Sequence, residues 1–188
     1  MKREQITIAG SLGSGKSSTA KAVAEVLGYT HFSSGDLFRK IAAERGESIE
    51  AINLTAEVQK DIDKKVDDML VEMGRTTEKL VVDSRMAWHW MPGSFKVFLL
   101  LDADSAAARI FQDVLKKSRV SEDAESVDDV RASIERRFAS EQKRYLSLYG
   151  VDPTDPKNFD LIIETKNNDL PHVVDSVLKG YEMWRKSI

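Results

Sequence analysis

The sequence predicts an α/β fold in which helices cover both faces of a mostly parallel sheet. Short β-branched or leucine-rich runs alternate with helical patterns along the whole chain. Two of these runs, KLVVD at 79–83 and FKVFLLLD at 95–102, show no alternation of apolar and polar residues. That pattern is typical of strands buried on both faces of a parallel sheet. A length of 188 residues without an internal repeat fits one domain with one core.

Hydrophobic spacing and stop signals set the expected elements. Further strands are expected at 5–9, 30–33 and 159–165. Helices are expected at 16–27, 36–44 and 106–115. A long charged helix that ends near Tyr149 and a closing amphipathic helix that carries Val173 to Trp184 are expected in the second half of the chain. An apolar stripe from Val58 to Met73 predicts one more long helix, closed by Gly74. The polar stretch at 116–129 is a candidate mobile loop.

Composition excludes several classes of protein. Lys and Arg total 28 against 31 Asp and Glu, so a net charge of −3 argues against general nucleic-acid binding, and any anion site must be local. The absence of cysteine excludes disulfides, thiolate catalysis and thiolate metal sites, and three histidines argue against a histidine-rich zinc site. The N-terminal apolar run is too short for a signal peptide or a membrane span. We expect a cytoplasmic protein with no membrane partner.

Residues 10–17, GSLGSGKS, match GxxxxGK[ST] between a predicted strand and a predicted helix. Glycines in this turn let successive N–H groups face one point, and the helix N-terminus adds positive potential there. Lys16 would reach the β- and γ-phosphates of ATP, and the Ser17 hydroxyl can ligate Mg²⁺. The alternative is a glycine-rich turn that binds nothing. The predicted ATP-binding residues are Gly10, Ser11, Leu12, Gly13, Ser14, Gly15, Lys16, Ser17 and Ser18, with Arg119 from the polar stretch.

The phosphate loop predicts nucleotide binding but not the reaction. GTPase switches that share it usually carry DxxG and NKxD, and neither pattern occurs in this chain. Phosphoryl transfer to a small acceptor is therefore the favoured interpretation. Such an enzyme needs cations for two sets of phosphates and a means to exclude water.

Two polar segments follow predicted strands, at the sheet edge where α/β folds bind ligands. In SSGDLFR, 33–39, Arg39 is placed to meet an acceptor phosphate, although a solvated arginine on a capped helix is the alternative. In VVDSR, 81–85, Asp83 would hold Mg²⁺-bound water or a substrate hydroxyl, and Arg85 can reach an acceptor phosphate. An N-cap of the following helix is the alternative for Asp83.

The long charged helix carries a row of arginines, Arg131, Arg136, Arg137 and Arg144. Arg137 and Arg144 are seven residues apart, so they lie within about 20° of each other on the helix and about 10 Å apart along it. Two guanidinium groups so placed could bracket a chain of phosphates. The alternative is a solvated face with surface ion pairs from Glu135, Glu141 and Lys143. We favour the solvated face for Arg131 and Arg136, and spacing alone leaves Arg137 and Arg144 open.

These motifs, in this order, resemble a nucleoside monophosphate kinase, most closely the cytidylate kinase-like group of archaeal type. The resemblance spans nearly the whole chain and includes GSGKSS, SSGDLFR, DIDKKVD at 61–67, DSR after the third strand, and EQKRYLSLYGVD at 141–152. It implies a five-stranded parallel core of order 2-3-1-4-5 in a single P-loop kinase domain, 1–188. It also implies an acceptor-binding insertion near 34–78 and a short lid near 116–137.

The resemblance also implies roles for particular residues. Arg39 and Arg85 would hold the acceptor phosphate, while Asp63 and Asp83 would contact sugar or base, or water around Mg²⁺. Lys16, Arg137 and Arg144 would be catalytic, and Ser17 and Asp83 would form the metal site. The full predicted acceptor site is Ser34, Gly35, Asp36, Arg39, Asp63, Asp83 and Arg85. The implied reaction is MgATP + (d)CMP → ADP + (d)CDP, by a monomer or weak homodimer.

The chain departs from the family pattern after the third strand. Ser84 stands where the family usually has glycine, and Trp88, His89 and Trp90 are bulkier than expected. These aromatic side chains either reshape the base site or serve packing. Two other functions stay open at this point: phosphoryl transfer to another nucleotide or a small metabolite, and nucleotide binding without catalysis.

Overall fold

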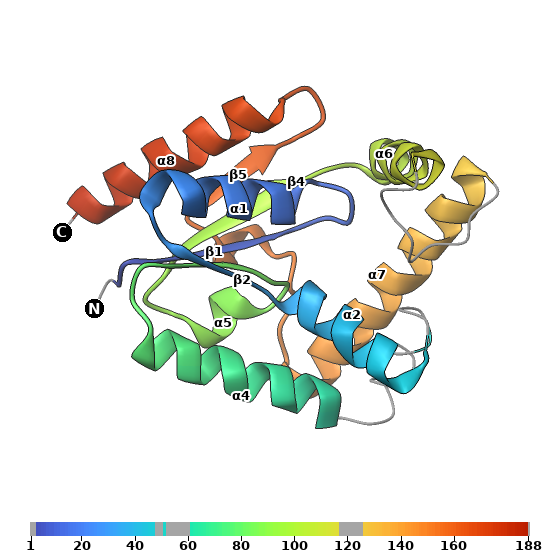
Figure 1. Cartoon of the computed structure of the whole chain (residues 1–188), viewed down its shortest axis with the longest axis horizontal. Helices are drawn as coiled ribbons and strands as arrows, with labels where there is room; N and C mark the ends of the chain where they lie inside the picture. The colour runs from blue at the N-terminus through green and yellow to red at the C-terminus, as the bar shows by residue number, and fades with distance from the viewer. Residues whose placement is uncertain (1–2, 48–50, 52–60, 117–125, 188) are drawn as a thin grey trace.

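The computed structural model describes residues 3–47, 51, 61–116 and 126–187. Its centre is a five-stranded sheet of order β2-β3-β1-β4-β5, in which every paired strand is parallel (Figure 1). The strands are β1 (Gln5–Gly10), β2 (Thr30–Ser33), β3 (Leu80–Asp83), β4 (Phe95–Leu100) and β5 (Leu161–Glu164). The predicted fold class and strand order are confirmed.

Helices cover both faces of this sheet. The helices are α1 (Lys16–Leu27), α2 (Ser34–Arg45), α4 (Asp61–Thr76), α5 (Ala87–Trp90), α6 (Ala103–Leu115), α7 (Val127–Tyr149) and α8 (Leu170–Lys186), with a 3-10 turn at Pro156–Asn158. In Figure 1, α1 and α8 lie on one face and α4 and α5 on the other, while α2, α6 and α7 gather beyond the end of β1. None of the described helices is long and apolar enough to cross a membrane.

Capping residues explain why two helices begin earlier than predicted, and close packing explains why a third continues past its predicted end. The Ser33 side chain accepts a hydrogen bond from the Asp36 backbone N–H at 3.2 Å, so α2 begins at Ser34 rather than at Asp36. Asp102 caps α6 in the same way, and that helix begins at Ala103 instead of Ala106. Gly74 does not close α4, which continues to Thr76. A Cβ on Gly74 would lie 2.9 Å from the Met91 side chain, so close packing accounts for this glycine.

Two apolar layers fix the position of β1. On one face, Ile6, Ile8 and Val97 pack with α1 and α8. On the other, Leu80 and Val82 of β3 pack with Leu70 of α4. Each fully buried aliphatic side chain contributes about 1.5–3 kcal/mol. Because all six residues of β1 are buried between β3 and β4, the turn that follows this strand starts from a rigid base.

The predicted insertion and lid are described only in part. Residues 48–50 and 52–60 of the insertion, and 117–125 of the lid, lie outside the described residues. Val58 and Arg119 are among them. The single-domain boundary, the insertion and the lid therefore stay predictions.

We predict that Gly10 is required for stability because a side chain there would collide with the backbone. Gly28, which also has a positive φ but has open space around it, should be far less sensitive to substitution. Gly10 has φ +146°, and a Cβ there would lie 2.2 Å from the Leu99 carbonyl oxygen. Gly28 has φ +66° with nothing within 4 Å. Gly10→Ala should lower the free energy of unfolding by about 3 kcal/mol or more, and Gly28→Ala by about 1 kcal/mol, in urea titrations. Equal losses would contradict the steric explanation.

Candidate active site

The turn between β1 and α1 forms the phosphate loop, and backbone contacts hold it against β4. The Ser11 N–H donates to the Leu99 carbonyl at 3.0 Å, and the Ser11 hydroxyl accepts from the Leu101 N–H at 3.2 Å. Lys16 folds back over the turn, and its Nζ donates to the carbonyls of Gly10 and Ser11 at 2.9 and 2.6 Å. Burial, followed by the charge of Arg85, lowers the pKa of Lys16 well below its ordinary value. A bound phosphate, as an anion, would favour the charged form of Lys16.

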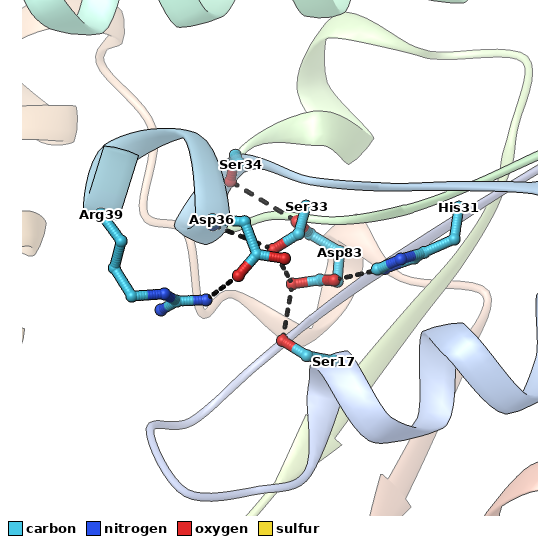
Figure 2. A network of polar contacts seen from close by, with 7 residues as sticks. All are labelled: Ser17, His31, Ser33, Ser34, Asp36, Arg39 and Asp83. Carbon is cyan, nitrogen blue, oxygen red and sulfur yellow. Dashed lines mark hydrogen bonds and ion pairs between the residues drawn. The ribbon is translucent and has the colours of Figure 1, made fainter. Parts of the chain in front are cut away.

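Asp83 is the centre of a polar network at the ends of β2 and β3 (Figure 2). Its carboxylate accepts hydrogen bonds from Ser17 and Ser33, both at 3.0 Å, and its second oxygen lies 2.7 Å from His31 Nε2. Burial raises the pKa of Asp83, but the bonds from His31, Ser33 and Ser17 outweigh this effect and hold the pKa below its ordinary value. Asp83 is not the cap of α5, whose N-cap is Met86. The network links the first turn of α1 to β3.

A cavity of about 270 Å³ lies between the phosphate loop, α2, the end of β3 and α7. The predicted residues that line it are Leu12, Gly13, Gly15, Lys16, Ser17, Ser18, Ser34, Gly35, Arg39, Asp83, Arg85, Arg137 and Arg144. Gly10, Ser11 and Ser14 belong to the loop but not to the lining, and Asp36 and Asp63 do not line the cavity. Arg119 lies outside the described residues. The structure thus brings together most residues of both predicted subsites.

Glu141 is buried, so the alternative that counted it among the surface ion pairs does not hold for this residue. It is 8% exposed, lines the cavity, and accepts a hydrogen bond from Arg85 Nε. Burial raises the pKa of Glu141, but Arg85, Arg137 and Arg144 outweigh it, so the pKa lies below its ordinary value. The helix turns Glu141 toward the sheet because Tyr145, one turn later, packs into an apolar cluster with Ala9 and Phe98.

Arg144 is also buried and pairs with Asp63 of α4. Arg144 Nε lies 2.8 Å from Asp63 Oδ2, and both side chains are less than 5% exposed. Burial raises the pKa of Asp63 to about 6 in spite of the opposing charge of Arg144. Asp63 therefore contacts a predicted catalytic arginine in this structure.

Arg131 and Arg39 lie on exposed faces of their helices and form surface ion pairs. Arg131 is exposed and pairs with Asp104 at 3.0 Å and Glu135 at 3.2 Å, as predicted for a surface residue. Arg39 pairs with Asp36 on the exposed side of α2 (Figure 2). Arg39 nevertheless lines the cavity and keeps access to a ligand there.

The aromatic residues after β3 pack in the structure. Trp88 is buried, its ring centroid lies 5.6 Å from that of Phe159, and its Nε1 donates to the Arg85 carbonyl at 2.8 Å. Trp90 Nε1 donates to Asp67 at 2.8 Å. None of Trp88, His89 and Trp90 lines the described cavity. Packing is thus the interpretation that the structure supports.

Sequence reasoning missed His31, Ser33, Glu141 and Tyr145. Glu141 could have been found, because Arg137, Glu141 and Arg144 follow i, i+4, i+7 spacing and must share one helix face. Ser33 could have been found as the last residue of a strand beside Asp83. The contact of His31 with Asp83 depends on strand register, which no local pattern predicts.

A parallel sheet of this order with a GxxxxGKS loop after β1 defines a P-loop kinase fold. Solved structures with this fold include shikimate kinase from Bacteroides thetaiotaomicron, with a TM-score of 0.64 and 17% identity over 96% of this chain and 98% of that chain. A gluconokinase from Sinorhizobium meliloti has a TM-score of 0.61 and 18% identity, with both chains covered completely. At this identity the similarity establishes the fold.

Sequence comparison establishes the family. Residues 5–167 match the cytidylate kinase-like family, and the chain belongs to it. The cytidylate kinase of Thermoplasma volcanium is 34% identical, over 98% of this chain and 95% of its own. That of Halorubrum lacusprofundi is 38% identical, over 85% of this chain and 80% of its own. The resemblance seen in the motifs is thus confirmed.

We predict that Asp63 makes stability depend on pH. The pKa of Asp63 in the folded protein, about 6, exceeds the ordinary value of 3.8. The contribution of Asp63 to the free energy of unfolding is therefore present at low pH and is lost as pH rises from about 4 to 6. The substituted asparagine cannot ionise, so the free energy of unfolding of Asp63→Asn minus that of wild type should increase by on the order of 2 kcal/mol from about pH 4 to pH 7. Urea titrations across this range measure the difference, and Asp104→Asn at the exposed Arg131 pair serves as the control. A constant difference between wild type and Asp63→Asn would contradict the prediction.

Proposed function

We propose that this chain transfers the γ-phosphoryl group of ATP to CMP or dCMP and releases ADP and CDP or dCDP. The observation that supports it most directly is the single cavity that joins the phosphate loop to Arg85, Arg137 and Arg144. A donor and an acceptor phosphate can therefore meet between cations on two sides. The family and the names of the relatives support the choice of CMP. We expect the enzyme to act in the cytoplasm on free nucleotides.

The phosphate loop is suited to the donor. The N-terminus of α1 carries roughly half a positive charge and open N–H groups, which favour bound phosphate. Lys16 would exchange its two carbonyl contacts for the β- and γ-phosphates. Phosphoryl transfer depends mainly on positioning and charge neutralisation, so a general base is not required. This is consistent with the position of His89 outside the cavity lining.

Ser17 and Asp83 fit a Mg²⁺ ion that accompanies ATP. Their oxygens lie 3.0 Å apart beside the phosphate loop, and Mg²⁺ prefers oxygen ligands with a few contacts from the protein. Bound there, the ion would neutralise charge on the β- and γ-phosphate oxygens. Ser33 and His31 would keep the Asp83 carboxylate oriented toward Ser17.

The arginines are suited to the acceptor and to the transferred group. Arg39 and Arg85 would hold the acceptor phosphate, whose oxygen attacks the γ-phosphorus in line. Arg137 and Arg144 would stabilise the charge that spreads over the transferring oxygens, and one such arginine can contribute about 10³–10⁵ in rate. To do so, Arg144 must either contact Asp63 and the phosphate together or break its ion pair with Asp63.

A different acceptor is the second candidate, because Ser84 lines the cavity where the family usually has glycine. A panel of nucleoside monophosphates, shikimate and gluconate, followed by coupled ADP release, separates the two. Stimulation by CMP or dCMP above all other acceptors supports the proposal. Stimulation by a non-nucleotide acceptor alone, or tight ATP binding without any transfer, would reject it.

We predict that Lys16→Met abolishes turnover while the fold is retained. The variant removes the charge at the β- and γ-phosphates but keeps a side chain of similar length. Turnover should fall by at least about 10³-fold, with Lys21→Met, on the exposed side of α1, as the matched control. Circular dichroism checks the fold. Full activity of a folded Lys16→Met variant would remove this loop from the reaction.

A second variant tests the acceptor side. Arg39→Ala should raise the KM for CMP about tenfold or more and leave the KM for ATP within twofold, because Arg39 lines the cavity at α2. Lys40→Ala, at the exposed neighbouring position, is the control. Steady-state kinetics with each substrate varied in turn provide the values. Equal effects on both KM values would place Arg39 outside the acceptor site.

A further inference from the structure

Glu141 is the one buried carboxylate that lines the cavity from the same helix as Arg137 and Arg144, within the part of the chain that the structure describes. The proposed reaction gives it no role, since a negative charge repels phosphate. Its position therefore needs a different explanation. Because buried charges are costly without partners, the explanation lies in the cations around it.

These cations come from two separate parts of the fold. Arg137 and Arg144 lie four residues before and three residues after Glu141 on α7, so they share its face. Arg85 follows β3 and reaches Glu141 across the cavity, where its Nε donates to Oε2. The Arg85–Glu141 pair thus joins the end of the sheet to α7. The bond uses Nε, and the guanidinium group has four further N–H donors.

The environment of this pair favours a lasting contact. Side-chain exposure is 22% for Arg85 and 10% for Glu141. Both residues also line a second, mainly apolar cavity of about 450 Å³, on whose wall Phe98, Ile134 and Phe138 lie. On that side the pair faces apolar groups, and in such surroundings an ion pair with a hydrogen bond is stronger than in water. The three neighbouring arginines keep Glu141 charged.

We infer that Glu141 is a positioning residue: it holds Arg85 against α7 before nucleotide binds, so that the acceptor phosphate meets a preassembled site. The inference rests on the proposed function and deepens it. Without Glu141, Arg85, Arg137 and Arg144 would repel one another, and Arg85 would no longer be fixed. Since misplacement of about 1 Å can cost about 10²-fold in rate, the effect should appear in the kinetics of the acceptor.

The kinetic test compares Glu141→Gln with Glu135→Gln, an exposed position on the same helix. Glu141→Gln should lower kcat/KM for CMP about 10²-fold, mainly through KM, and leave the KM for ATP within twofold. Glu135→Gln should match wild type. Glu141→Asp, which keeps the charge but shortens the side chain, should restore part of the loss. Unchanged CMP kinetics in a folded Glu141→Gln variant, or equal losses for CMP and ATP, would overturn the inference.

A second measurement needs no substrate and remains valid if the acceptor is not CMP. In nitrogen-15 spectra of the nucleotide-free protein, the Arg85 Nε–H, identified by its loss in Arg85→Lys, should be protected from exchange with water. Protection should disappear in Glu141→Ala, which removes the acceptor, and persist in Glu135→Ala. If wild type turns over CMP poorly, the proposed function fails, yet this signal still decides the role of Glu141. An unprotected Nε–H in wild type, or one that stays protected in Glu141→Ala, would overturn the inference.

Discussion

Like charges converge on the cavity beside the phosphate loop, and carboxylates from neighbouring elements hold them there. Lys16, Arg85, Arg137 and Arg144 line one small space, and their positive charges repel one another. Glu141 keeps a lowered pKa, which means that its attraction to the arginines exceeds the cost of burial. Burial raises the pKa of Asp63, even though Arg144 lies beside it.

The topology explains why these groups meet. Parallel strands all end at one edge of the sheet, so the phosphate loop after β1, Asp83 on β3 and Ser33 on β2 arrive side by side. α7 then closes the open side of this edge and supplies the remaining cations (Figure 1). The sheet edge thus carries the phosphate loop and Asp83, and α7 brings Arg137 and Arg144 to the same cavity.

Local patterns predicted the core well because a strand buried on both faces consists almost entirely of apolar residues, which the sequence shows directly. They predicted element ends less well, since caps at Ser33 and Asp102 and the packing of Gly74 against Met91 act at single residues. The local pattern also could not decide whether Glu141 is exposed or buried. A charged residue on a charged helix has the same local signature whether it faces water or a partner 56 residues away, as Glu141 faces Arg85.

The sequence by itself determined the parallel α/β architecture, the phosphate loop and the family, because these depend on hydrophobic spacing, glycine positions and motif order along the chain. Only the tertiary structure decided which charges pair. It buried Glu141 against Arg85 and Asp63 against Arg144, it placed His31 on Asp83, and it turned the tryptophans after β3 into packing residues. Such contacts join distant segments, and the strength of each depends on burial that exists only once the helices have packed on the sheet.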